Sequence, residues 1–100
     1  MYKILLCCAA GMSTSLLVTK MKKYAKIADI EVDVWAVPVA ELKDNLPVDC
    51  ILLGPQIRYA EKSVKETVGD TPVVNIDMRS YGRMDGEKVL NMAVDAIEKK

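Results

Sequence analysis

The chain has 100 residues, 51% of them hydrophobic, and its 14 basic residues balance 14 acidic ones. This length suffices for one domain, predicted over 1–100, and the zero net charge provides no field that would draw the chain to nucleic acid. The absence of histidine excludes Cys-His and Ser-His catalysis within the chain. The three cysteines lack C-x-x-C or metal-ligand spacing, so no disulfide, metal or cofactor is expected.

The N-terminal stretch is predicted to form a strand, a loop of small residues and a helix. Residues 2–6 are short and apolar, as in a buried strand, which we expect to end near Cys8. The helix is predicted from Ser13 or Thr14 to about Ile27, with either hydroxyl as its N-terminal cap. Its apolar stripe has helical spacing and consists of Leu17, Met21, Tyr24 and Ala28.

The middle of the chain predicts two strands separated by a short helix. Residues 30–37 begin with alternating apolar and charged side chains, which indicates a strand at a sheet edge, ended by Pro38. A short helix is predicted over 39–45. Residues 48–53 form a continuous apolar run, which favours a central strand with Cys50 as a buried, inert thiol.

The last third predicts a helix, a strand, a loop and a final helix. The helix carries its apolar stripe from Ile57 to Val68 and stops at Gly69. A strand over 72–76 is followed by a polar loop over 77–86 and a helix from about Asp85 to Lys99. Four strands alternating with helices predict an α/β fold: a four-stranded parallel open sheet with helices on both faces.

No segment is predicted to cross a membrane. The apolar run 4–18 has the look of a secretory signal, but the small and polar residues 11–15 interrupt it and no A-x-A cleavage pattern follows. No span reaches the ~18 consecutive apolar residues of a membrane helix. We therefore expect a cytoplasmic protein.

The loop after the first strand is the candidate site. A cysteine ends the strand, and the following small residues lead into the start of a helix, where backbone N–H groups and the helix dipole attract anions. Cysteines at helix N-termini favour the nucleophilic thiolate. We therefore predict Cys8 as the catalytic residue, beside a phosphate-binding loop formed by Ala9, Ala10, Gly11, Met12, Ser13, Thr14 and Ser15.

Other interpretations of these residues remain open. Strand-end cysteines are often inert packing residues, which accounts well for Cys7 and less well for Cys8. A cysteine phosphatase loop has the form C-x-x-x-x-x-R, and Thr14 stands here where that arginine would be. Gln56, after the turn Gly54-Pro55, is a possible supporting phosphate ligand or simply a turn residue. The loop therefore favours holding and transferring phosphate over hydrolysing it.

Three segments resemble one known family in the right order. The run from Cys8 to Leu17, the run from Leu52 to Ile57, and Tyr81-Gly82 with Asp85-Gly86 are similar to the enzyme IIB components of the bacterial sugar phosphotransferase system, lactose/cellobiose/chitobiose type. The form of the loop resembles the cellobiose/chitobiose branch more than the lactose branch. The departure is Ala9, where relatives can carry serine.

The resemblance implies an activity and partners. Cys8 would accept a phosphoryl group from a phosphohistidine on a IIA protein and pass it to a sugar held by a membrane IIC permease. The sugar would be cellobiose, chitobiose or a related β-linked disaccharide. The chain would then be a phosphotransferase acting at the inner face of the membrane.

The main rival function is that of a low-molecular-weight cysteine phosphatase or an arsenate-reductase-like enzyme, which the missing arginine disfavours. Receiver and nucleotide-binding modules fit less well, because their acidic clusters and glycine motifs are absent.

Overall fold

A computed structural model of the chain describes residues 1–8 and 12–99, and of residues 12–14 the backbone only. Its strands form one parallel sheet in the order β2-β1-β3-β4. They are β1 (Tyr2–Cys8), β2 (Val32–Pro38), β3 (Cys50–Leu53) and β4 (Val73–Asn75). The predicted four-stranded parallel sheet is therefore confirmed, with β2 at an edge and β3 inside, as the hydrophobic patterns indicated.

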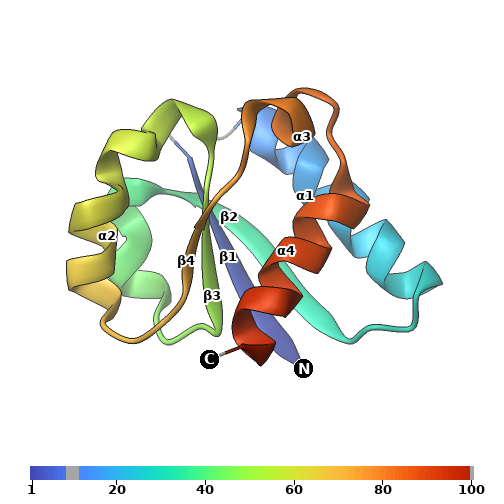
Figure 1. Cartoon of the computed structure of the whole chain (residues 1–100), viewed down its shortest axis with the longest axis horizontal. Helices are drawn as coiled ribbons and strands as arrows, with labels where there is room; N and C mark the ends of the chain where they lie inside the picture. The colour runs from blue at the N-terminus through green and yellow to red at the C-terminus, as the bar shows by residue number, and fades with distance from the viewer. Residues whose placement is uncertain (9–11, 100) are drawn as a thin grey trace.

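Helices cover both faces of this sheet, as predicted. Figure 1 shows α1 and α4 on one side of the strands and α2 on the other. The helices are α1 (Met12–Ile27), η1 (Val39–Asn45), η2 (Pro55–Ala60), α2 (Glu61–Val68), α3 (Met78–Gly82) and α4 (Gly86–Glu98), where η1 and η2 are 3-10 helices. No helix in the described part of the chain is long and apolar enough to span a membrane.

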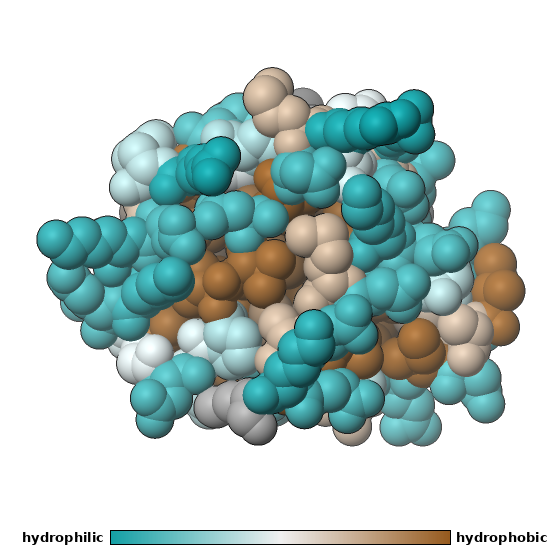
Figure 2. All heavy atoms as spheres, in the orientation of Figure 1, coloured by the Kyte–Doolittle hydropathy of each residue, from teal (hydrophilic) through white to brown (hydrophobic). Residues whose placement is uncertain are grey.

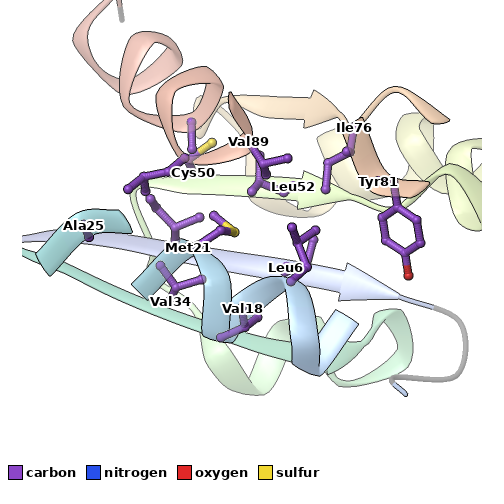
Figure 3. Packing of buried hydrophobic residues seen from close by; sticks show 14 residues of the cluster. Leu6, Val18, Met21, Ala25, Val34, Cys50, Leu52, Ile76, Tyr81 and Val89 are labelled. Carbon is purple, nitrogen blue, oxygen red and sulfur yellow. The ribbon is translucent and has the colours of Figure 1, made fainter. Parts of the chain in front are cut away.

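The central strands bury alternate side chains in two separate cores, because successive side chains of a strand point to opposite faces. Ile4 and Leu6 of β1 lie in the core under α1 and α4, with residues of those helices such as Met21 (Figure 3). Leu5 and Cys7 lie in the core on the side of α2, and all four side chains are fully buried. The continuous apolar runs of β1 and β3 reflect this burial on two faces.

Helix α1 ends at Ile27 as predicted, but its buried stripe differs from the prediction at one position. Leu17 and Met21 are fully buried as expected, and Tyr24 is half-buried against the same core. Ala28 is exposed, because α1 ends one residue earlier and Ala25 takes the buried position instead. Extending the helical spacing beyond the last helical turn produced this error.

Residues 77–86 contain a helix that the sequence analysis treated as loop. Asp77 caps α3, because its carboxylate accepts a hydrogen bond of 2.9 Å from the N–H of Ser80. Ile76, just before this cap, and Tyr81, four residues after it, belong to the same core. This pairing of apolar residues around an N-cap is a hydrophobic staple, and it fixes the direction in which the chain enters the helix.

Helix α2 ends at the predicted glycine. Gly69 caps α2 with a φ of 68°, a conformation that L side chains rarely adopt. All three residues of β4, the other edge strand, are half-buried. Figure 2 accordingly shows hydrophobic side chains where β4 runs in Figure 1, bordered by hydrophilic ones.

Candidate active site

The strand order creates a topological switch point between β1 and β3. From β1 the chain passes through α1 on one face to β2, and from β3 it passes through α2 on the other face to β4. The two connections therefore leave neighbouring strands in opposite directions. In open parallel sheets, ligands bind outside the carboxyl ends of the strands at such a switch point. Cys8 and Gly54 are the residues at these two strand ends.

Cys8 is the last residue of β1, opposite Pro38 of β2. Its exposed fraction is 4%, so Cys8 is buried in this structure. The Sγ atom lies 3.7 Å from the carbonyl oxygen of Val37, a weak contact in which the thiol donates.

The other two cysteines are unsuited to nucleophilic chemistry. Burial, with a smaller contribution from the neighbouring Cys8, raises the pKa of the Cys7 thiol to about 11. Burial, with a smaller contribution from Asp49, raises the pKa of Cys50 to about 12. Both thiols remain protonated near neutral pH, and both are fully buried in the cores. Cys50 is buried, as predicted.

The predicted phosphate-binding loop is described only in part. Ala9, Ala10 and Gly11 lie outside the described residues, as do the side chains of Met12, Ser13 and Thr14. The backbone of α1 begins at Met12, so Ser13 and Thr14 belong to its first turn rather than acting as its cap. The first N–H groups of a helix have no acceptor within it, and here that end of the helix follows Cys8 after three residues.

Gln56 lies beside the end of β1. Its side chain is exposed, and a Cβ added to Gly54 would lie 3.2 Å from its Oε1 and 3.7 Å from the carbonyl oxygen of Cys7. The N–H of Gly54 donates to that same carbonyl at 3.2 Å. A glycine at position 54 therefore lets the Gln56 carboxamide approach the peptide that carries Cys8. Gln56 therefore lies at the carboxyl ends of β1 and β3, as predicted, and its contact with phosphate stays a prediction.

Asp77, which follows β4 at the start of α3, has a structural role. Its carboxylate binds the N–H of Ser80, and this bond lowers the pKa of the carboxyl group below its ordinary value of 3.8. A carboxyl group with a lowered pKa is ionised at neutral pH and has no proton to give to a leaving group. Asp77 is therefore the cap of α3 and a poor general acid.

We expect Asp77→Ala to lower the unfolding midpoint at pH 7 by a few degrees, because an N-cap is lost. Since the folded pKa lies below the unfolded value of 3.8, the stabilisation by the carboxylate is present above that pH and disappears as the pH falls through the folded pKa. Thermal unfolding followed by circular dichroism should show the gap between wild type and variant narrowing below pH 4. Asp77→Asn, which keeps a capping oxygen, should retain most of the stability at pH 7. Equal midpoints for wild type and Asp77→Ala at pH 7 would contradict this role.

Tyr81 also reaches this edge of the sheet, and the sequence analysis did not select it as a site residue. It is 7% exposed and belongs to the core under α1, and its Cε1 would lie 3.7 Å from a Cβ on Gly54. Its position could have been inferred from the cap: Tyr81 is the fourth residue after the N-cap Asp77, a position whose side chain packs toward the residue before the cap.

Comparison with known proteins agrees with this arrangement. The family model described as "PTS system, Lactose/Cellobiose specific IIB subunit" matches residues 3–92. The oligo-beta-mannoside-specific EIIB component of Bacillus subtilis (strain 168) is 41% identical over 97% of each chain. The cellobiose-specific EIIB component of Lactococcus lactis subsp. lactis (strain IL1403) is 40% identical over 90% of this chain and 91% of its own. The solution structure of a cellobiose-specific phosphotransferase IIB component from Borrelia burgdorferi has a TM-score of 0.83 at 39% identity, over 99% of this chain and 94% of its own.

The fold is that of a small parallel α/β protein, which this chain shares with a solved IIB component of a sugar phosphotransferase system. This chain belongs to the lactose/cellobiose-specific IIB family of the phosphotransferase system. It is therefore a phosphotransferase of sugar uptake, as the resemblance of its segments implied. IIB components work together with IIA and IIC partners.

Proposed function

We propose that Cys8 carries the phosphoryl group, accepting it from a phosphohistidine of a IIA protein and passing it to a sugar held by a membrane IIC protein. The observation that carries the proposal is the position of Cys8 at the carboxyl end of β1, beside the switch point and three residues before α1. The two other thiols are fully buried with raised pKa values, which leaves Cys8 as the candidate nucleophile.

The transfer to sulfur needs no metal or cofactor. The S–P bond forms as the N–P bond of phosphohistidine breaks, and the thiol proton ends on the imidazole nitrogen that loses phosphorus. Cys8 must first turn away from Val37, which costs only one weak contact from sulfur to a carbonyl oxygen at 3.7 Å. The second transfer replaces the S–P bond with an O–P bond to a sugar hydroxyl, and sulfur regains a proton.

The loop after β1 supplies the charge compensation in this proposal. We assign phosphate binding to the N–H groups and side chains of Ala9, Ala10, Gly11, Met12, Ser13, Thr14 and Ser15, with Gln56 in support. The support for this assignment is the start of the 16-residue helix α1 at Met12, because the N-terminus of a helix attracts anions. Thr14 stands where phosphatases hold an arginine, so the bound group is kept for transfer rather than hydrolysed.

The sugar that we propose is cellobiose, chitobiose or a related β-linked disaccharide. Among its relatives, one is named for oligo-beta-mannosides and another, about equally identical, for cellobiose. Both names indicate β-linked sugars, whereas a third relative, 40% identical, is named for galactose. The names therefore give the class of sugar partial support and leave the individual sugar to the IIC partner. With that partner in the membrane, the chain would work in the cytoplasm at its inner face.

Phosphorylation by a donor tests the carrier role. We expect the protein, incubated with a phosphorylated IIA protein of the lactose/cellobiose type, to gain the mass of one phosphoryl group, measured on the intact chain. The same sample should not turn over an aryl phosphate, because the sequence of the loop has no arginine and the carboxyl group of Asp77 is ionised at neutral pH. Steady hydrolysis of the aryl phosphate without a stable mass gain would instead favour the phosphatase interpretation.

A further inference from the structure

Tyr81 lies near the carboxyl ends of β1 and β3, where Cys8 is also found. It is a tyrosine among the buried residues of the core under α1, 7% exposed, and it comes from α3, which follows β4 rather than β1 or β3. A buried tyrosine places its ring among apolar groups and brings its hydroxyl to a polar partner. The direction in which this hydroxyl points therefore indicates where it acts.

The hydroxyl end of the ring faces the end of β1. A Cβ on Gly54 would lie 3.7 Å from Cε1 of Tyr81 and also 3.7 Å from the carbonyl oxygen of Cys7. Cε1 is bonded to the ring carbon that carries the hydroxyl, so this end of the side chain, rather than its Cβ end, is the part beside Gly54. Figure 3 shows the Tyr81 oxygen next to the tip of β1, where Cys8 ends the strand.

The ring of Tyr81 is held by its burial in the core under α1, and its backbone is held by two hydrogen bonds. Its N–H donates to the carbonyl of Asp77 at 3.0 Å, and its carbonyl accepts from the N–H of Met84 at 3.1 Å. The cap of α3 at Asp77 and the packing of Ile76 against the same core hold the helix that carries it. A hydroxyl held in this way is a preorganised donor, which needs little reorganisation when a charged group arrives.

We propose that Tyr81 is a phosphoryl-binding residue, whose hydroxyl donates a hydrogen bond to a non-bridging oxygen of the phosphoryl group on Cys8. This inference rests on the proposed function of Cys8. The hydroxyl keeps its proton throughout, so it takes no part in the bond changes between nitrogen, sulfur and the sugar oxygen. Its effect is to favour the phosphorylated form of this protein relative to the phosphorylated donor.

The equilibrium between donor and acceptor tests the inference. Because a hydrogen bond to a charged group changes an equilibrium constant by about tenfold or more, Tyr81→Phe should lower the equilibrium constant for phosphorylation by a phosphorylated IIA protein by at least that factor. The fractions are measured by intact mass after equilibration. A matched control is Tyr24→Phe, which removes a hydroxyl from a half-buried tyrosine of the same core about 18 Å along α1 from Met12. This control should equilibrate as wild type.

The outcomes separate this inference from the proposed function. If Tyr81→Phe equilibrates as wild type while Cys8 is still labelled, the role of Tyr81 is wrong and the carrier role stands. If wild type itself gains no phosphoryl group, the carrier role fails. Should Tyr81→Phe unfold, wild type labelled with carbon-13 at the tyrosine Cζ positions gives a second test, because the chain has only four tyrosines. Phosphorylation should then shift the Tyr81 resonance most, and an unchanged Tyr81 resonance would overturn the inference.

Discussion

Cys8→Ser is expected to reduce phosphorylation by a IIA donor to background and to abolish phosphoryl transfer to sugar. The substitution replaces sulfur by oxygen with almost no change in shape, so the fold should persist. A serine hydroxyl is a weak nucleophile unless a neighbouring base activates it, and the chain has no histidine to do so. Intact mass after incubation with the phosphorylated donor is the measurement, with the unfolding midpoint recorded on the same sample.

The other two cysteines provide matched controls. Cys7→Ala and Cys50→Ala should both keep the mass gain, because their thiols are fully buried and their pKa values are raised by burial. Alanine is preferred to serine at these two positions, since a hydroxyl would leave an unpaired polar group in an apolar core. Loss of labelling in Cys7→Ala alone, with the fold retained, would move the reactive residue to Cys7.

Much of the fold was predictable because each strand carries its own hydrophobic pattern. The unbroken apolar run of β3 predicted a central strand, and the alternation at the start of β2 predicted an edge. The stop of α2 at Gly69 followed from the residue type that tolerates a φ of 68°. These are local properties, and local properties are what a single sequence displays.

The candidate site was predictable only where it is continuous in the chain. Cys8 and the residues that follow it form one segment, so a strand, a loop and a helix start could be inferred together. Tyr81 lies more than seventy residues away, and only the packing of α3 against the sheet brings its ring beside Gly54. The burial of the Cys8 thiol, with 4% exposed, likewise depends on tertiary packing, which residue spacing does not reveal.

Gly86→Ala is expected to destabilise the protein more than any other single methyl addition at a described glycine. A Cβ on Gly86, the first residue of α4, would lie 2.6 Å from the carbonyl carbon of Lys20 and 2.7 Å from the N of Met21. These are backbone atoms of α1, so no side-chain rotation relieves the clash and the two helices must move apart. Overpacking of this kind costs about 1–3 kcal/mol or more. For a chain of this length the unfolding midpoint should fall by about 5–20 °C.

Gly82→Ala is the matched control for this prediction. Gly82 ends α3, has no heavy atom within 4 Å of an added Cβ, and so accepts the same methyl group without a clash. Alanine at such a position restricts the unfolded chain and stabilises by about 0.4–1 kcal/mol. Thermal unfolding should therefore shift in opposite directions for the two variants. If Gly86→Ala unfolds at the wild-type temperature, α4 does not seat its first turn against the backbone of α1. The packing that closes one face of the sheet over Met21 and Leu90 would then have to be revised.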